Sequence, residues 1–390
     1  MPVSPPPAAS AVPDNLPALD VLSARHALRV AAHLRRLIAH APDRFLPFEL
    51  WMDQALYAPG LGYYAAGSTK FGGDTPSGDF TTAPELTPLF GRTLSRQVEE
   101  ILRLSDSAHV LEFGAGSGAL AASLIPALRA QGVEPRYLIM EVSADLRQRQ
   151  RERLAPLEAD IAWLDAPPRR FHGCVVANEV LDAMPACLFV WDEDGQVREL
   201  GVGLDDNRDF VWLHRAAPPA LEEAVRARMP CLPGYQSEVN LRAEAWVRGL
   251  GDWLEKGAAL LLDYGMPRRE YYHPQRAQGT LMCHFRHHAH DRPLIHPGLQ
   301  DITTHVDFTA MADAALAGGL DVLGYASQAR FLMNAGLLTH LSDADPRTLS
   351  AVQKLVSEAE MGELFKVLAL GRDIGGPLSG FLGGDRRGRL

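Results

Sequence analysis

A glycine-rich turn in the first half of the chain is the strongest sign of chemistry in this sequence. The segment GAGSG (114–118) lies between the apolar run 109–113 and the helix-forming run 119–130. Glycine lets a ligand approach the backbone closely, and the start of a helix offers free N–H groups with a partial positive charge. A tight turn of purely structural role has the same pattern. The predicted cofactor-binding glycines are Gly114, Gly116 and Gly118.

Two acidic residues flank this turn. Glu141 ends the next apolar run, 23 residues after Gly118. Its two oxygens can accept both hydroxyls of a ribose, which suits NAD and S-adenosylmethionine (SAM) equally. Glu112 precedes the glycines by two residues, where a carboxylate can serve the cationic methionyl end of SAM directly or through water. The anionic pyrophosphate of NAD would be repelled there, so Glu112 favours SAM.

A second polar group follows another apolar run. The segment ANEVLDAMP (177–185) places Asn178, Glu179 and Asp182 after the apolar residues 171–177. In an open α/β sheet the carboxyl ends of the central strands line the ligand crevice. We therefore expect Asn178 beside the cofactor and Glu179 at the reacting centre. Asp182 has an equally good explanation as compensation for the dipole of a helix start.

A histidine-rich stretch offers a different chemistry. His284 and His288 stand four residues apart, as on a metal-binding helix face. The nearby Pro293 and Pro297 instead indicate a loop, and the chain has no HExxH or CxxC motif. We therefore predict no metal. The residues that could supply zinc ligands are Cys283, His284, His287, His288, His290 and His296.

Strands and helices alternate around these residues, which predicts an α/β fold with a parallel sheet and right-handed crossovers. The apolar runs predict strands at 109–113, 137–143, 171–178, 257–265, 321–327 and 365–372. The helical spacing of apolar residues predicts helices at 23–40, 47–56, 119–130, 143–154 and 308–320, and one after Thr87-Pro88.

The same pass along the chain predicts its domain organisation. We expect a disordered tail at 1–20, a helical region at 21–104 that covers cofactor and substrate, and a catalytic domain at 105–375. Within that domain, 191–240 reads as an insertion with a hairpin and a helix, and 266–304 as a long substrate loop. Residues 376–390 are expected to form a flexible tail.

Composition excludes several classes of protein. Lys and Arg total 38 against 48 Asp and Glu, so a chain of net charge -10 is not expected to coat nucleic acid. No apolar run reaches 18 residues, so no membrane insertion is expected. Four scattered cysteines and the lack of a basic leader indicate a reducing compartment, and we expect a cytoplasmic enzyme.

Four blocks stand out in order along the chain: SGDFTTAPELTPLFG (77–91), LEFGAGSGALA (111–121), ANEVLDAMP (177–185) and the segment 279–308. Together they resemble the MidA family, and the resemblance covers roughly residues 20–375. It implies a class I SAM-methyltransferase fold, with a mostly parallel seven-stranded sheet and S-adenosyl-L-methionine as cofactor. It also implies protein arginine N-methylation, with symmetric dimethylarginine formed on a respiratory complex I-type subunit.

The resemblance also implies roles for single residues. Glu179, with Asp182 second, would face a guanidinium on a protein substrate. His305 resembles a residue of the polar loop that arginine methyltransferases place over the substrate. The glycine turn and Glu141 match the cofactor-binding motifs. The block that would cover the cofactor contains Asp79, Phe80, Thr81 and Thr82.

Several alternatives stay open on the sequence alone. The short Pro/Ala tail, in place of a mitochondrial presequence, indicates a cytoplasmic bacterial member and leaves the substrate undefined. An NAD-dependent oxidoreductase would use the same glycine turn. A non-catalytic assembly factor could keep a vestigial SAM fold. A homodimer is possible through 191–240 or through the N-terminal helices.

Overall fold

The computed structural model describes residues 12–13, 15–66, 82–342 and 344–390, and the chain divides into two interleaved units. The first unit combines residues 1–80, 183–242 and 269–305. The second unit combines residues 81–182, 243–268 and 306–390.

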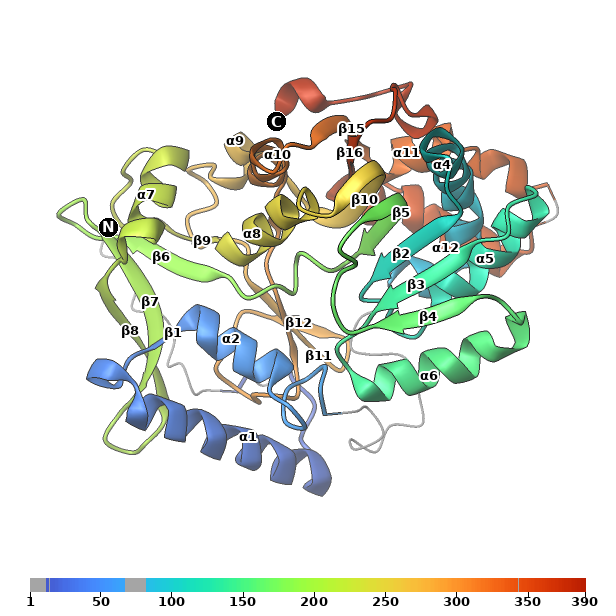
Figure 1. Ribbon diagram of the computed structural model, residues 1–390. Helices are drawn as coiled ribbons and strands as arrows, with labels where there is room; N and C mark the ends of the chain where they lie inside the picture. The colour runs from blue at the N-terminus through green and yellow to red at the C-terminus, as the bar shows by residue number, and fades with distance from the viewer. Residues whose placement is uncertain (1–11, 14, 67–81, 343) are drawn as a thin grey trace. The chain divides into compact units, whose positions relative to one another are not determined.

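The second unit contains a large sheet with seven strands in the order β15-β16-β10-β5-β2-β3-β4 (Figure 1). A further short strand, β14, pairs with the end of β10. The strands from β10 to β4 are parallel, whereas β16 is antiparallel to both of its neighbours. The expected mostly parallel seven-stranded sheet is confirmed. Its seven strands are β2 (His109–Phe113), β3 (Arg136–Met140), β4 (Ile161–Leu164), β5 (Phe171–Asn178), β10 (Leu254–Met266), β15 (Asp321–Ser327) and β16 (Phe365–Arg372), and the short strand beside β10 is β14 (Val306–Asp307).

Helices cover this sheet because their apolar residues recur at helical spacing. Helix α4 contacts β5 and β10, and α10 contacts β10, β15 and β16. One buried core joins alternate strand residues, such as Val110 and Val176, to apolar residues of α4 and α5. The longer helices of the second unit are α4 (Leu89–Ser105), α5 (Ala119–Ala130), α6 (Ala144–Leu154), α10 (Phe308–Ala317), α11 (Gln328–Asn334) and α12 (Pro346–Val356). Its short helices include α3 (Ala83–Leu86), η4 (Leu337–His340) and α13 (Met361–Leu364), and α8 (Leu241–Leu250) begins at the unit boundary.

The first unit contains two smaller sheets. A five-stranded sheet runs β1-β7-β6-β9, with β8 on β7, and a three-stranded sheet runs β12-β11-β13. Helices α1 (Val21–His40) and α2 (Phe48–Tyr57) contribute Leu34, Trp51 and Leu56 to the core of this unit. The strands are β1 (Leu46–Pro47), β6 (Cys187–Trp191), β7 (Val197–Leu204), β8 (Phe210–Ala216), β9 (Gln236–Val239), β11 (Met282–Phe285), β12 (His288–His290) and β13 (Asp301–Thr303). Helices α7 (Pro219–Arg228) and α9 (Arg268–Tyr271) complete it.

Three expected regions differ from the observed organisation. Helices of region 21–104 divide between the two units, because α4 belongs to the second unit and α1 and α2 to the first. Segment 266–304 holds three short strands rather than only a loop. The expected flexible tail at 376–390 is packed, since Leu378 and Phe381 are buried in the core of the second unit. In the described part of the chain, every helix is too short or too polar to cross a bilayer.

Candidate active site

The glycine turn joins β2 to α5 with the conformation that glycine allows. Gly114, Gly116 and Gly118 have φ angles of 62°, 52° and 83°, in the left-handed region that other residues rarely adopt. An added Cβ at Gly116 would meet no atom within 4 Å. No side chain caps the start of α5, and its first turn carries no acidic residue. The turn therefore presents bare backbone, which fits the close approach of a cofactor.

Glu141 stands beside this turn at the end of β3, and a glutamine joins the two. The amide of Gln150, on α6, donates to the Gly116 carbonyl at 2.8 Å and to Glu141 Oε2 at 3.1 Å. The Ser143 N–H donates to Glu141 Oε1 at 2.9 Å. Trp163 Nε1 in turn donates to Gln150 Oε1 at 2.8 Å. Each Glu141 oxygen keeps a lone pair, so the carboxylate can still accept a pair of ribose hydroxyls.

Glu112 lies on the face of the sheet that α4 and α5 cover. Tyr137 donates its hydroxyl to Glu112 Oε2 at 2.7 Å, and both side chains are buried. Burial raises the pKa of Glu112 to about 7, against the hydrogen bond from Tyr137, and the charge of Glu141 raises it further. Glu112 is therefore partly protonated near neutral pH. Its contact with the cofactor stays a prediction.

Glu179 follows the last residue of β5 in an unusual backbone conformation. Its φ of 54° places a residue with a Cβ in the left-handed region, which costs about 1–2 kcal/mol. The Glu179 N–H donates to the Leu262 carbonyl at 2.8 Å, which holds the turn against β10. Glu179 Oε1 accepts from Asn178 Nδ2 at 3.1 Å and from the Ala83 N–H at 3.3 Å. Such strain is typical of functional sites, where the surrounding structure enforces it.

A third acidic residue, Asp263, supports the segment that follows Glu179. Its Oδ2 accepts from the N–H groups of Leu181 at 2.9 Å and Asp182 at 3.2 Å. Asp263 is 1% exposed, and burial raises its pKa, with further contributions from the charges of Asp182 and Glu179. Three carboxyl groups therefore gather at the carboxyl ends of β5 and β10. A cationic group bound there would relieve their repulsion.

Within the block 77–91, the start of helix α3 contacts this site. Thr82 precedes α3 without capping it, and the next residue, Ala83, donates to Glu179. The predicted cover residues Asp79, Phe80 and Thr81 lie outside the described residues.

His305 belongs to the first unit, where a buried acid organises its backbone. The His305 N–H donates to Thr280 Oγ1 at 2.9 Å, and its carbonyl accepts from the Tyr271 hydroxyl at 3.1 Å. Both hydroxyls also donate to Glu238, which is 1% exposed and has its pKa raised by burial. The backbone of His305 is thus held at both its N–H and its carbonyl. Its predicted role over the substrate stays a prediction.

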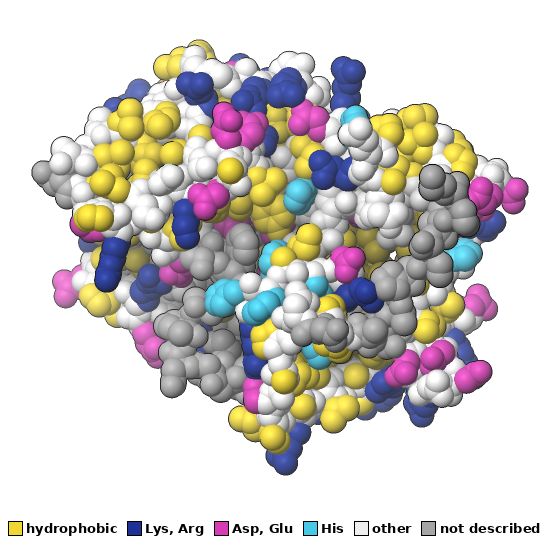
Figure 2. All heavy atoms as spheres, turned by 180° about the vertical axis from the view of Figure 1, so that it is seen from behind, with side chains coloured by type: hydrophobic (Ala, Val, Ile, Leu, Met, Phe, Trp, Pro, Cys, Tyr) yellow, Lys and Arg dark blue, Asp and Glu magenta, His cyan; other side chains and the backbone are white. Residues whose placement is uncertain are grey.

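The histidine-rich stretch forms part of the three-stranded sheet. His287 and His288 are exposed, whereas His290 is buried, and burial lowers its pKa to about 4. Figure 2 shows histidine side chains gathered on one face of the molecule. Among the residues that the structure describes, no three His, Cys, Asp or Glu side chains are grouped to hold a metal ion.

Comparison with known proteins shows which family the chain belongs to. Residues 93–326, more than half of the chain, match the family described as "Putative S-adenosyl-L-methionine-dependent methyltransferase". A Burkholderia thailandensis protein crystallised with S-adenosylhomocysteine is 48% identical, with a TM-score of 0.91 over 96% of this chain and 100% of that chain. The chain belongs to this methyltransferase family. Membership confirms the methyltransferase class and the expected cofactor, S-adenosylmethionine.

Curated relatives of this methyltransferase are more distant. Protein arginine methyltransferase NDUFAF7 of Danio rerio is 28% identical over 366 residues, which cover 82% of each chain. The Drosophila melanogaster homologue of the same name is 27% identical over 373 residues, covering 83% of this chain and 81% of that one.

Three residues that support the candidate site were not predicted from the sequence. Gln150 has the polar character of a surface position on α6, yet its side chain is buried beneath the glycine turn. Asp263 interrupts the apolar run GAALLLDYG, and an acid inside such a run is the one signal that could have identified it. Tyr137 lies in the next strand, β3, and belongs to no motif.

Proposed function

We propose that this methyltransferase transfers a methyl group to an arginine of a protein substrate and forms symmetric dimethylarginine. In this proposal Glu179 holds the guanidinium, Asp182 assists, and His305 takes part in proton transfer. Gly114, Gly116, Gly118 and Glu141 bind the cofactor, with Glu112, Asn178, Thr82 and Asp79 around it. The substrate is a respiratory complex I-type subunit or another protein.

The observation that carries the proposal is the placement of the Glu179 carboxylate. It follows the central strand β5 and is held by Asn178 and by the Ala83 N–H. A carboxylate is the side chain best suited to bind a guanidinium through paired hydrogen bonds. Asp182 and Asp263 lie beside Glu179, and the repulsion among these acids raises the pKa of Asp263. A cationic substrate would relieve this repulsion and a neutral one would not, which favours a guanidinium.

The chain's own residues supply alignment, exclusion of water and a route for a proton. S-adenosylmethionine, when bound, supplies a methyl group that its sulfonium already activates. Glu179 would orient one guanidinium nitrogen and polarise it, since a free guanidinium is a poor nucleophile. The nitrogen loses a proton after methylation, and His305 is our candidate to accept and relay it.

The names of the curated relatives support arginine as the target, since NDUFAF7 of fish and fly is called a protein arginine methyltransferase. The 48% identity to a Burkholderia thailandensis protein supports a bacterial member. We place the activity in the cytoplasm as part of the same proposal. Family membership favours this function over an NAD-dependent oxidoreductase, and the experiment below distinguishes it from a non-catalytic assembly factor.

The proposal is tested by replacing Glu179 with Gln and measuring two quantities separately. Calorimetry with S-adenosylhomocysteine reports cofactor binding, and labelled S-adenosylmethionine added to a lysate reports transfer. Mass spectrometry of the labelled proteins then identifies methylated arginine. We expect Glu179→Gln to bind S-adenosylhomocysteine within about twofold of the unaltered chain and to lose about 100-fold or more in transfer, because the amide cannot hold a guanidinium as a carboxylate does.

A matched variant, Glu152→Gln on the exposed surface of α6, should keep both properties. Unchanged transfer by Glu179→Gln, with cofactor binding intact, would remove Glu179 from catalysis. Label on residues other than arginine would keep the methyltransferase and overturn its proposed specificity. Absence of transfer by the unaltered chain, with S-adenosylhomocysteine bound, would favour the assembly factor.

A further inference from the structure

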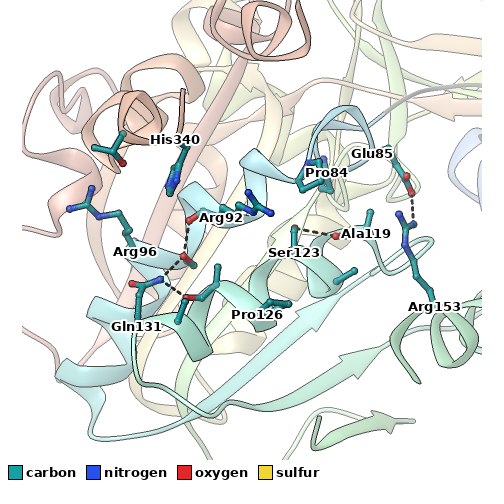
Figure 3. A pocket seen from close by; sticks show the side chains of 16 residues that line it. Pro84, Glu85, Arg92, Arg96, Ala119, Ser123, Pro126, Gln131, Arg153 and His340 are labelled. Carbon is teal, nitrogen blue, oxygen red and sulfur yellow. Dashed lines mark hydrogen bonds and ion pairs between the residues drawn. The ribbon is translucent and has the colours of Figure 1, made fainter. Parts of the chain in front are cut away.

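A hollow of about 820 Å³ lies on the surface of the second unit, outside the candidate active site. Helices α3, α4, α5 and η4 contribute to its lining, as Figure 3 shows. Gly91 of α4 packs so closely on Ser123 of α5 that an added Cβ would collide with its hydroxyl. The two helices therefore form a shallow floor between them, on which Ala122, Pro126 and other small apolar side chains lie.

Positive charge dominates the lining of this hollow, although the chain as a whole carries a net charge of -10. The lining contains three arginines, Arg92, Arg96 and Arg153, and one carboxylate, Glu85. Arg153 already pairs with Glu85 at 3.3 Å at one end of the hollow. Among the described residues, neither Arg92 nor Arg96 has an acidic partner.

His340 of η4 lies at the same end of the hollow as Arg92 and Arg96. Figure 3 shows its ring reaching toward α4 between Arg92 and Arg96. Burial lowers the pKa of His340, and the charges of Arg92 and Arg96 lower it further. His340 Nε2 is buried and has no hydrogen-bond partner within the described part of the chain. An acceptor atom at this end would satisfy three donors at once.

The volume of the hollow and the residues that line it indicate which kind of anionic ligand would fit. A volume of about 820 Å³ suits a ligand much larger than a single phosphate ion. Among the described residues that line the hollow, only His340 has an aromatic ring on which a nucleobase could stack. Arg92 and Arg96 are four residues apart on α4, which separates their Cα atoms by about 6 Å along the axis. Alternate side chains of an extended peptide share one face at a spacing of about 7 Å, which matches this separation.

We propose that this hollow is a docking site for an extended segment of a partner protein in which two acidic residues are separated by one residue. The two carboxylates meet Arg92 and Arg96, and His340 donates to the nearer one. The other side chains of the peptide, between the two acidic residues and on either side of them, lie on the small apolar residues of α5. The inference goes beyond the proposed function and does not depend on which residue the enzyme methylates.

Helix α3 lies between this docking site and the active site. Its residues Pro84 and Glu85 line the hollow, whereas Ala83 donates its N–H to Glu179. A docked segment would therefore contact the same four-residue helix that holds the Glu179 carboxylate. Docking is expected to bring a partner protein to the enzyme close to the site where its reaction takes place.

The experiment uses the full chain and a phage-displayed library of random short peptides. We expect selection to enrich peptides in which Asp or Glu alternate with another residue. An enriched peptide, labelled with fluorescein, is then measured by anisotropy at low ionic strength. The double substitution Arg92→Gln and Arg96→Gln should weaken its binding by about tenfold or more, because both charge-assisted pairs are lost. His340→Ala should weaken it less.

Arg103→Gln removes one positive charge from the same helix, at a side chain that is 63% exposed and outside the hollow. It should leave the affinity within about twofold, since screened surface charges at that distance contribute little. The proposal would be overturned if the double variant bound the peptide as tightly as the unaltered chain, or if Arg103→Gln weakened binding as much as the double substitution does. Enrichment of peptides without paired acidic residues would also overturn it. Light scattering provides a further test, because a dimer that dissociates in the double variant would make a second copy of this chain the occupant instead. Unchanged binding of S-adenosylhomocysteine and unchanged thermal unfolding confirm that the variants are folded.

Discussion

Gln150 and Glu141 are joined by a hydrogen bond of 3.1 Å beneath the glycine turn, and the same amide holds the Gly116 carbonyl at 2.8 Å. One side chain of α6 therefore fixes the distance between the two parts of the site that are expected to hold the adenosyl group. Gln150 belongs to no recognisable sequence motif, so its role is inferred from these two hydrogen bonds alone.

Replacing Gln150 with Leu keeps the volume of the side chain and removes both donated bonds. We expect affinity for S-adenosylhomocysteine to fall by about tenfold, because a lost hydrogen bond to a charged group costs about 1.5 kcal/mol or more. Calorimetry measures the affinity and thermal unfolding measures the stability. Gln148→Leu, at an exposed position of the same helix, is the matched control. Equal affinity of the two variants would contradict the role given to Gln150.

Comparing Gly116→Ala with Gly132→Ala should distinguish the effect of backbone strain on stability from the effect of the added methyl group on cofactor binding. Gly116 and Gly132 both have positive φ, and an added Cβ at either would meet no atom within 4 Å. Alanine at either position should therefore cost about 1 kcal/mol of unfolding free energy. Only Gly116→Ala should weaken binding of S-adenosylhomocysteine, by about tenfold or more, because only its methyl would occupy the cofactor's place. Equal binding by both variants would show that the cofactor does not approach this turn.

Glu112→Gln should change how stability depends on pH. Burial raises the pKa of Glu112 from 4.5 to about 7, so the folded chain keeps a proton that the unfolded chain has lost. Its contribution to stability is fully present below pH 4.5 and is lost as the pH rises through 7. Across this window the loss amounts to about 3 kcal/mol. Glutamine still accepts the bond from Tyr137 and does not titrate.

Denaturant unfolding of both chains at several pH values checks this expectation for Glu112. The free energy of unfolding of the unaltered chain, minus that of Glu112→Gln, should fall steadily from pH 4.5 to 7. A constant difference would mean that Glu112 ionises normally in the fold.

Glu179→Gly should stabilise the fold while it removes the activity. The φ of 54° strains any residue with a Cβ, and glycine relieves about 1 kcal/mol of that strain. Transfer from labelled S-adenosylmethionine should fall as in Glu179→Gln. Thermal unfolding compares Glu179→Gly with Glu179→Ala, which keeps the strain and should be the less stable of the two. The reverse order would show that this backbone is not strained.

Local signals in the sequence predicted the elements that carry the glycine turn. The strand at 109–113 and the helix at 119–130 have the bounds expected from the apolar run, the glycines and the alanine-rich segment that follows. Here neighbouring residues determine the conformation. The short strand β4 was missed, since its four residues are all only partly buried and its sequence, IAWL, lacks alternation.

Structure that depends on distant partners could not be predicted. Strand β1 pairs with β7 through Leu46 and Val202, far apart in the chain, and no local pattern indicates such a pairing. The acidic residues of the candidate site also depend on distant partners. Glu179 was expected from its place after a strand, but two of the N–H groups that donate to Asp263 lie 82 and 81 residues away from it.

Strand β16 is the last strand of the chain, yet it lies between β10 and β15 in the large sheet. Eight of its residues pair with β10, whose run from Gly257 to Met266 is buried throughout. During synthesis β16 is therefore made after every other strand of the large sheet, and β10 cannot be covered on this side until residues 365–372 have left the ribosome. A nascent chain, or one shortened by a premature stop before residue 365, would present β10 as an open edge, and unpaired apolar edges recruit other chains into aggregates.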